Sequence, residues 1–574
     1  MPRNRDSRLS SIVILMVLLS LCACCIAPSV RIEKDVMIPM RDGVELAANI
    51  SRPDSQSSFP VIIVRTPYDK DNEEDGDWGE YWAEQGYVFV LQDCRGTGNS
   101  TGEWYPAIHE RADGVDTREW VLKQPWCNGS IGTTGGSYLG FTQFAASLDS
   151  TTAIKAMFPE IALMDWYDGV TYIDGALSIG TVMNWGLEMA EPSMGEGIHV
   201  NWEESDQDRV FRTLPLIDFD KNVGMRLPWM RDWILNPSYN EYWAPLNIDS
   251  LKTQCETPLI AVSGWYDIFM HQALEYQAHA IENGKQDQHL IIGPWAHGPN
   301  WVEGERELGE NHELDFDSIQ MSWFGKWLKG EEWKEELAPI KLYVMGSNVW
   351  RNEQEWPLAR TQYTNYYLHS DGSANTARGN GRLSLSTPGD EPQDQFQYEP
   401  HDPVPTLGGS LLFGEPGPMD QEDIEKRHDV LVYTSEVLKE PLEVTGPVKL
   451  ILHASSDSRD TDWTGKLVDV YPDGRAFNLC DGVIRARYRH GPSNPELITP
   501  DKVYRYEIDL WATSNVFLPG HRIRVEISSS NFPRFDRNPN TGNTFGMDAD
   551  IRTAEQTVYH DKLYPSYILL PVIG

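Results

Sequence analysis

Apolar runs that alternate with helical stretches are the feature that most constrains how this chain can fold. Two continuous apolar runs, residues 60–65 and 87–91, flank a helical pattern over residues 78–85, and a second helical pattern covers residues 108–124. Continuous apolar strands are typical of a parallel sheet that helices cover on both faces, because neither face of such a strand meets water. The sequence therefore predicts an α/β domain.

The α/β pattern is interrupted and then resumes. Strand-like runs return at residues 258–262 and 289–292, whereas residues 161–250 have no strand rhythm and carry many tryptophans and tyrosines at helix-like spacing. We predict an α/β domain in two parts, residues 31–160 and 251–338, with residues 161–250 inserted as a helical cap over the active site.

The C-terminal part follows a different pattern. Polar and apolar residues alternate with period two at residues 504–510 and 522–527, which is typical of antiparallel strands with one face in the core. We predict a β-sandwich, of the jelly-roll type, over residues 339–574. Residues 370–400 are rich in Gly, Ser, Asp and Gln and are expected to form a long surface loop.

A serine stands in a glycine-rich turn after the short strand predicted at residues 130–134. Residues 135–140 read Gly-Gly-Ser-Tyr-Leu-Gly, which places Ser137 between that strand and a helix. A tight strand-to-helix turn exposes a nucleophilic hydroxyl, and it needs glycine where the backbone folds over itself. Ser137 is therefore the candidate nucleophile.

An acid and a base follow Ser137 in the order found in α/β-hydrolases. Asp267 comes directly after the strand predicted at residues 259–263, and His297 comes directly after the strand near residues 290–292. Both residues lie at the carboxyl edge of the sheet, where the ligand chemistry of such folds collects. Ser137, Asp267 and His297 are therefore predicted to form a catalytic triad.

Asp93 also follows a strand and competes with Asp267 for the role of the acid. It precedes the serine, however, and Arg95 two residues later suggests a structural ion pair. The chain order favours Asp267.

Seven segments closely resemble the CocE/NonD hydrolases, the cocaine esterase-like relatives of the X-Pro dipeptidyl-peptidases. They are residues 65–70, 93–100, 126–140, 264–267, 293–297, 469–475 and 528–534. The resemblance extends from about residue 31 to the end of the chain. It implies the triad named above and an oxyanion hole made by the Tyr68 hydroxyl and the backbone N–H of Tyr138. It implies neither a metal nor an organic cofactor.

The residues after Asp267 bear on the substrate. Relatives that hydrolyse α-amino acid esters carry carboxylates there, whereas this chain has Ile268-Phe269-Met270, and a buried ammonium without a carboxylate would be costly. We expect an apolar or aromatic acyl group instead. The residues expected in its pocket are Trp265, Phe269, Trp166 and Tyr172.

The predicted function is that of a serine hydrolase that cleaves carboxylic esters, or amides, through an acyl-enzyme. The alternatives are an X-Pro dipeptidyl-peptidase or an acylase for peptides or β-lactams, and, from another class, a non-catalytic surface binding protein. Nucleic acid is excluded as a partner, because 86 acidic residues against 48 basic ones give a formal charge of −38.

The first 28 residues read as an export signal. Arg3, Arg5 and Arg8 precede an apolar stretch over residues 12–21, and residues 21–24 (Leu-Cys-Ala-Cys) resemble a bacterial lipobox with Cys24 as the lipidated residue. The alternatives are cleavage after Ala27, which gives a secreted protein, and an uncleaved anchor. We expect an extracytoplasmic protein that an acyl anchor holds at a membrane.

Four cysteines lie in the body of the chain: Cys94, Cys127, Cys255 and Cys480. An oxidising compartment permits disulfides, and Cys94 and Cys127 both lie near the predicted catalytic strands. The spacings specify no pairing and no zinc site, so free thiols stay an equal alternative.

Overall fold

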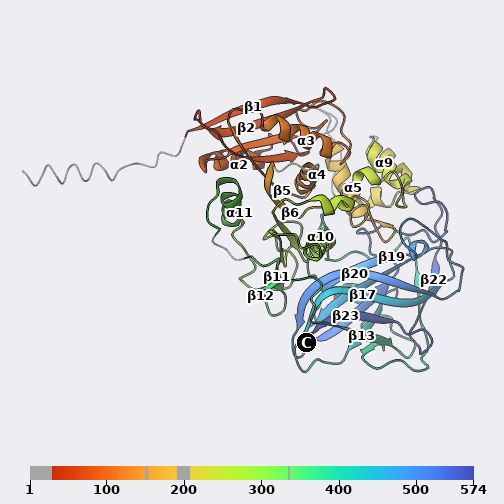
Figure 1. Ribbon diagram of the computed structural model, residues 1–574. Coiled ribbons are helices and arrows are strands. Elements are labelled where there is room, and N and C mark those ends of the chain that lie inside the picture. Colours follow the sequence, from red (N-terminus) through yellow and green to blue (C-terminus); the bar gives the residue numbers. More distant parts are fainter. Residues whose placement is uncertain (1–28, 149–152, 191–206, 226, 334–336) are drawn as a thin grey trace, which may run out of the picture.

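The computed structural model describes residues 29–148, 153–190, 207–225, 227–333 and 337–574. The predicted export signal and Cys24 lie outside these residues. The chain forms an α/β domain with an inserted cap, which packs against a C-terminal β domain (Figure 1).

The α/β domain is built on a ten-stranded sheet with the order β1-β2-β4-β3-β5-β6-β9-β10-β11-β12. Its central strands, from β4 to β11 in that order, are parallel, whereas β1, β2 and β12 pair with their neighbours as antiparallel strands. The strands are β1 (Val30–Pro39), β2 (Glu45–Pro53), β3 (Phe59–Thr66), β4 (Val88–Asp93), β5 (Cys127–Gly136), β6 (Ile154–Glu160), β9 (Leu259–Gly264), β10 (Gln288–Gly293), β11 (Ile340–Val344) and β12 (Val349–Glu353).

Helices pack against this sheet as the apolar strand pattern requires. They are α2 (Glu73–Glu84), α3 (Glu110–Val121), α4 (Tyr138–Ser147), α10 (Met270–Glu282), α11 (Phe316–Phe324) and the π-helix η5 (Gly325–Lys329). The sheet packs closely on α11 at Gly132 of β5. A Cβ there would lie 2.8 Å from a ring carbon of Phe324, so the position requires glycine. The predicted α/β-hydrolase fold is confirmed.

The cap lies between β6 and β9 and is mainly helical, as predicted. It contains β7 (Tyr172–Ile173), β8 (Ala176–Leu177), α5 (Ile179–Glu188), α7 (Gln207–Phe211), η2 (Leu216–Asp218), α8 (Phe219–Val223), α9 (Pro228–Leu235), η3 (Ala244–Leu246) and η4 (Asp249–Gln254). Its core is aromatic: the Trp166 ring centroid lies 5.3 Å from that of Trp185 and 5.9 Å from that of Trp233.

The C-terminal domain has eleven strands, and all of its pairings are antiparallel except that of β14 with β16. The elements are β13 (Thr361–His369), β14 (Arg382–Ser384), β15 (Asp394–Tyr398), η6 (Gln421–Lys426), β16 (Leu431–Ser435), β17 (Leu442–Ser456), β18 (Asp462–Val470), β19 (Ala476–Arg485), η7 (Ala486–Tyr488), β20 (Tyr504–Phe517), β21 (Arg522–Ser528), β22 (Ala554–Tyr559) and β23 (Tyr567–Ile573). Four long strands, β13, β17, β20 and β23, lie side by side in this domain (Figure 1).

Two expectations for the C-terminal part were wrong. The boundary predicted at residue 339 cuts into the hydrolase sheet, because β11 pairs with β10 and β12 extends the sheet to Glu353. Residues 370–400 are not one surface loop, since they contain β14 and β15. Asp394 is fully buried there, and it accepts hydrogen bonds from Ser370 and Tyr433 that a polar sequence does not reveal.

The four cysteines of the body are free thiols, so Cys94 and Cys127 do not pair. Burial raises the pKa of the Cys94 thiol well above its ordinary value, and its Sγ lies 3.5 Å from a Glu110 carboxylate oxygen. Among the described helices, none has the length and apolar character needed to cross a membrane.

Candidate active site

Ser137 stands on a strained turn between β5 and α4. Its backbone has φ 57° and ψ −121°, a conformation that side-chain-bearing residues rarely adopt, and its N–H donates to the Glu160 carbonyl at 2.9 Å. Glycines make the turn possible. A Cβ at Gly135 would lie 2.7 Å from that of Leu139, and one at Gly140 would lie 2.4 Å from that of Ala162.

The loops after β9 and β10 bring Asp267 and His297 to Ser137. His297 Nε2 lies 3.0 Å from Ser137 Oγ, and His297 Nδ1 lies 2.8 Å from Asp267 Oδ1. The buried carboxylate is held from both sides, because Oδ2 accepts from Ser263 at 2.8 Å and Oδ1 accepts from the Phe269 N–H at 3.2 Å. This is the geometry of a nucleophile, its general base and the acid that orients the base.

Tyr68 follows β3 and faces Ser137. Its hydroxyl oxygen accepts a hydrogen bond from the indole N–H of Trp185 at 3.1 Å. Burial raises the pKa of Tyr68 to about 12, although the hydrogen bonds with Trp185 and Ser137 oppose the rise. The phenol therefore keeps its proton at neutral pH and can donate it to a developing oxyanion.

The second donor expected for the oxyanion is the backbone N–H of Tyr138 rather than its ring. Tyr138 is the first residue of α4, so no carbonyl of its own helix can accept its N–H. Its hydroxyl instead donates to Glu110 at 3.0 Å and accepts from the Ala107 N–H at 2.9 Å. The buried Glu110 is paired with Arg65 at 2.8 Å, so the Tyr138 side chain has a structural role beneath the site.

A cavity of about 350 Å³ opens above Ser137. It is lined by Tyr68, Ser137, Tyr138, Leu163, Trp166, Val170, Thr181, Val182, Trp185, Phe269 and Leu412. Among the described residues, no charged side chain lines this cavity. Trp166 and Phe269 are where the sequence placed them, and the Phe269 ring stands edge-on to His297 at 5.2 Å.

Two other residues expected in the pocket lie elsewhere. Trp265 points away from Ser137, because its indole N–H donates to the Tyr343 carbonyl at 2.7 Å and its ring packs on Trp356. Tyr172 is buried inside the cap, where its hydroxyl donates to the Trp233 carbonyl at 3.0 Å. Trp265 is close to Asp267 in sequence and Tyr172 belongs to the aromatic insertion, but packing directs both side chains away from the cavity.

Several lining residues were missed by the sequence analysis. They are Leu163, Val170, Thr181, Val182, Trp185 and Leu412. They come from the cap and, in the case of Leu412, from the C-terminal domain, and no local motif marks them. The aromatic richness of the insertion was the one signal that pointed to Trp185.

A second cavity of about 740 Å³ adjoins the first and shares Thr181 and Leu412 with it. It lies between α5 and the loop of the C-terminal domain around residues 406–415, and its lining includes the polar and charged residues Asn184, Gln207, Glu415 and Arg534. The reaction centre therefore has an apolar side and a more polar side.

Asp93 has a structural role, but its expected partner was wrong. Its carboxylate accepts from the Lys70 N–H at 2.7 Å and lies 3.2 Å from the Lys70 ammonium. Arg95 instead pairs with Asp113 at 2.7 Å and with Asp42 at 2.8 Å.

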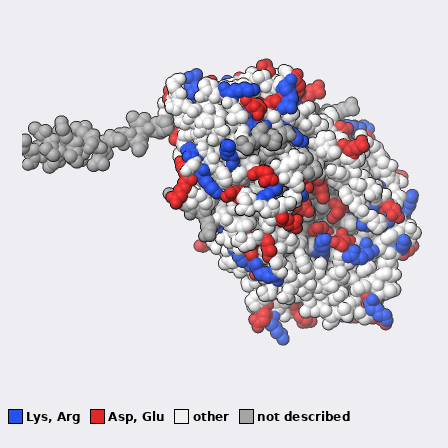
Figure 2. Space-filling model, viewed as in Figure 1, with Lys and Arg blue, Asp and Glu red and all other residues white. Residues whose placement is uncertain are grey.

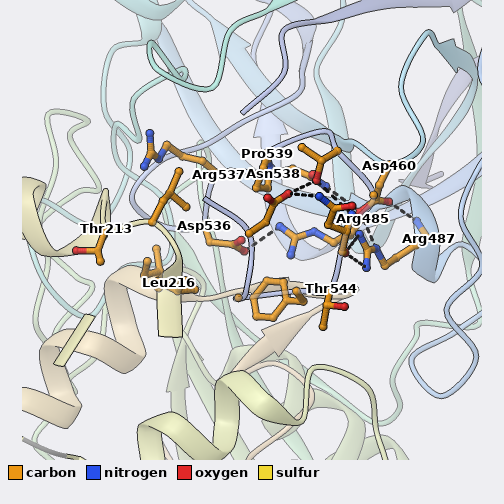
Figure 3. Close-up of a pocket in the computed structure, with 18 of the residues that line it drawn as sticks. Thr213, Leu216, Asp460, Arg485, Arg487, Asp536, Arg537, Asn538, Pro539 and Thr544 are labelled. Carbon is orange, nitrogen blue, oxygen red and sulfur yellow. Dashed lines mark hydrogen bonds and ion pairs between the residues drawn. The ribbon is translucent and has the colours of Figure 1, made fainter. Parts of the chain in front are cut away.

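A further pocket between the cap and the C-terminal domain is crossed by ion pairs (Figure 3). Arg485 pairs with Asp462 at 2.8 Å and with Asp536 at 2.9 Å. Asp536 in turn accepts from the Leu177 N–H of the cap at 2.7 Å, and this contact fastens the cap to the β domain. Within the described part of the chain, no group of three or more His, Cys, Asp or Glu side chains could hold a metal ion.

Known proteins match both parts of the chain. Residues 42–299 match the family described as X-Pro dipeptidyl-peptidase (S15 family), and residues 331–569 match the X-Pro dipeptidyl-peptidase C-terminal non-catalytic domain. The cocaine esterase of Rhodococcus sp. (strain MB1 Bresler) is 39% identical over 569 residues, which cover 94% of this chain and 98% of that protein.

Two solved structures share the fold over nearly the whole length. One is an α-amino acid ester hydrolase, with a TM-score of 0.82 and 27% identity over 96% of this chain and 98% of that one. The other is an aminopeptidase from a marine sediment archaeon (Thaumarchaeota archaeon), with a TM-score of 0.81 and 27% identity over 96% and 97%. The chain belongs to the CocE/NonD family of serine hydrolases.

Proposed function

We propose that Ser137, His297 and Asp267 hydrolyse neutral carboxylic esters whose acyl group is compact and apolar or aromatic. The observation that carries this proposal is the uncharged cavity above Ser137, which Trp166, Trp185 and other apolar side chains wall. The space above Ser137 is small and walled by apolar rings, so it suits a compact acyl group rather than a whole peptide.

The residues act in a definite order in this proposal. His297 Nε2 takes the proton of Ser137 as Oγ attacks the ester carbonyl, while Asp267 orients the ring and stabilises the imidazolium. The Tyr68 hydroxyl and the Tyr138 N–H donate to the oxyanion of the tetrahedral intermediate. His297 then gives its proton to the leaving alcohol. A water that the same ring deprotonates cleaves the acyl-enzyme and releases the acid.

The leaving alcohol has its own space in this arrangement. The second cavity meets the first at Thr181 and Leu412, and it offers polar side chains such as Asn184 and Gln207. We place the acyl group in the first cavity and the alcohol in the second.

A free α-amino group fits this site poorly. Two structural neighbours are called an aminopeptidase and an α-amino acid ester hydrolase. A substrate ammonium in the cavity above Ser137 would lose its hydration and find no carboxylate in the lining. Removal of X-Pro dipeptides, the activity for which the matching family is named, is the alternative that the test below separates.

The test uses two esters that differ in one group. The p-nitrophenyl esters of phenylacetic acid and of phenylglycine differ only by the α-ammonium, and we expect kcat/KM to favour the neutral ester at least 100-fold. Ser137→Ala should abolish both reactions. Faster turnover of Ala-Pro p-nitroanilide by the wild type would replace the esterase with the dipeptidyl-peptidase. No turnover of any substrate, together with no labelling by a fluorophosphonate, would favour the binding protein.

We also propose that the N-terminal segment exports the protein and that Cys24 carries the lipid. The support is the order of basic residues, apolar stretch and Leu-Cys-Ala-Cys at residues 21–24. In a bacterial host fed radiolabelled palmitate, the full chain should take up label and partition into detergent, and Cys24→Ser should do neither. Label on Cys24→Ser, or a soluble unlabelled wild type, would contradict the anchor.

A further inference from the structure

The loop that carries His297 is long and has little structure of its own. It runs from Pro294 to Asp315 between β10 and α11, all of it described, without a helix or strand. Its local closure comes from the Asn300 side chain, which donates to the Leu314 carbonyl at 2.8 Å and accepts from the Leu314 N–H at 3.0 Å. A loop of this length needs support from outside to hold a side chain in place.

That support comes from the C-terminal domain. The Glu305 N–H donates to the Pro418 carbonyl at 2.8 Å, and the Glu305 carboxylate accepts from the Asp420 N–H at 3.0 Å. The two backbones are in close contact, because a Cβ on Gly417 would lie 2.5 Å from the Glu303 carbonyl oxygen.

Arg306 anchors the loop more deeply. Its side chain is 1% exposed, and the guanidinium donates to the Tyr471 hydroxyl at 3.0 Å and to Asn515 Oδ1 at 2.8 Å. It also lies 3.4 Å from Asp469, whose other oxygen lies 2.8 Å from His521 Nδ1. Nε and Nη2 carry these contacts, whereas Nη1 is buried without a hydrogen-bond partner among the described residues, so one edge of the guanidinium holds the loop on β18 and β20.

The loop that carries Asp267 is also held by the C-terminal domain. The buried Tyr266 hydroxyl donates to the Asn478 carbonyl of β19 at 3.2 Å. The Tyr266 backbone N–H donates to the Trp295 carbonyl at 2.9 Å. This hydrogen bond joins the loop that carries Asp267 (the acid loop) to the loop that carries His297 (the base loop). Gly264 permits this contact, because a Cβ there would lie 2.1 Å from the same Trp295 oxygen.

We propose that the C-terminal β domain sets the geometry of the Asp267–His297 pair, and that Arg306 and Tyr266 are the positioning residues through which it does so. The proposal rests on the proposed triad and goes beyond it, since the matching family describes this domain as non-catalytic. Hydrogen bonds of 2.8 and 3.0 Å join the three triad residues, and a misplacement of about 1 Å can cost a reaction about 100-fold.

Arg306→Lys tests this anchor in the full-length enzyme. Lysine keeps the positive charge but lacks the planar guanidinium that donates to Tyr471 and Asn515 at once. We expect kcat for a neutral p-nitrophenyl ester to fall 10- to 100-fold, with KM changed less than threefold. The acid limb of the pH–kcat/KM profile should move to lower pH, since an imidazolium held less closely by Asp267 is less stabilised. In the His297→Ala background, Arg306→Lys should cause no further loss.

The matched control is Arg489→Lys. Arg489 lies in the same domain, its side chain is 2% exposed, and it bonds to the Ala486 carbonyl and to Glu496 rather than to either catalytic loop. This variant should lower Tm and leave kcat and the pH profile unchanged. Wild-type kcat and an unshifted profile in Arg306→Lys, or an equal loss in the His297→Ala background, would overturn the proposal.

Tyr266→Phe keeps the proposal testable if Arg306→Lys does not fold. It removes a single hydroxyl, and we expect a 3- to 10-fold loss of kcat with the same direction of pH shift. An unfolded Arg306→Lys together with a Tyr266→Phe enzyme of wild-type kcat and profile would also overturn the proposal. Full activity in His297→Ala itself would instead show that the triad is wrong, which separates the two failures.

Discussion

Trp185 combines two tasks at the level of single residues. Its ring walls the cavity above Ser137, and its indole N–H donates to the Tyr68 hydroxyl oxygen at 3.1 Å. Because an indole can only donate, the phenol proton stays directed toward the reaction centre. A phenol that accepts one hydrogen bond also becomes a better donor of the next. In the proposed mechanism, the cap therefore helps to build the oxyanion hole as well as the pocket.

The first prediction concerns this pair of residues. Tyr68→Phe should lower kcat about 100-fold, which corresponds to about 3 kcal/mol for one oxyanion donor, with KM little changed. Trp185→Phe should lower kcat about 3- to 10-fold in the wild type, because it removes the polarising donor. In the Tyr68→Phe background it should cause no further loss of kcat, which steady-state kinetics on a neutral ester can measure.

The control for this cycle is Tyr87→Phe. The Tyr87 hydroxyl is buried and, in the described chain, has no hydrogen-bond partner. Its loss should leave kcat unchanged. An additive loss in the Tyr68→Phe Trp185→Phe double variant would show that Trp185 acts only through the pocket.

Glu160 gives the second prediction, which concerns stability. Its carbonyl holds the Ser137 N–H, and its side chain accepts from Gln320 at 3.3 Å. Burial raises the pKa of this carboxyl from 4.5 to about 7. The folded chain therefore binds more protons than the unfolded chain between those values, so the free energy of unfolding falls as pH rises through that window.

Glu160→Gln should remove this loss. The variant and the wild type should unfold alike at pH 5, whereas at pH 8 the variant should be more stable by on the order of 1–3 kcal/mol. Urea unfolding at pH 5 and at pH 8 measures the free energy of unfolding of the variant and of the wild type. The exposed Glu282→Gln is the control and should show no such difference. Equal stabilities of Glu160→Gln and wild type at pH 8 would mean that the carboxyl is not desolvated.

At the scale of elements, the catalytic loops depend on close backbone contacts that only glycine permits. Gly264→Ala would place a Cβ 2.1 Å from the Trp295 carbonyl oxygen and separate the acid loop from the base loop. We expect Tm to fall and kcat to drop at least 10-fold, since the Asp267–His297 hydrogen bond depends on that contact. Thermal unfolding and ester kinetics at a temperature where the variant is folded provide the measurement.

Gly389→Ala is the matched control for the third prediction. A Cβ at Gly389 meets nothing within 4 Å, and its backbone is not in the left-handed region. This variant should keep the Tm and kcat of the wild type. A Gly264→Ala enzyme with wild-type kcat would show that the loops adjust without loss of the triad.

Sequence predicted the elements that obey local rules. The strand at residues 259–263, the glycines around Ser137 and the order of Ser, Asp and His placed the triad, because each rests on a short pattern. The same reasoning failed for Trp265, whose direction depends on a contact with β11, and for Leu412, which reaches the site from another domain. It also missed β11 and β12 as part of the hydrolase sheet, since alternating strands look alike in either domain.

The whole molecule carries a large negative charge. The formal charge is −38, and on the face shown in Figure 2 acidic side chains gather around the hollow near its centre. Like charges in a compact state repel one another and relax when the chain unfolds. A neutral ester, in contrast, meets no net attraction or repulsion from this surface, which agrees with an uncharged acyl cavity.

The last prediction follows from this charge. At 10 mM salt the repulsion extends about 30 Å, whereas at 0.1 M it extends about 10 Å, so added NaCl should raise Tm by on the order of a few degrees and then reach a plateau. KCl should act equally, since screening depends on ionic strength and not on the cation. The surface ion pairs, such as that of Lys449 with Glu507 at 2.8 Å, act in the opposite direction, because salt weakens them. Exposed pairs contribute little each, so self-repulsion should dominate. A Tm that falls as NaCl rises would mean that the ion pairs outweigh the net charge, and kcat/KM for a neutral ester should stay constant in either case.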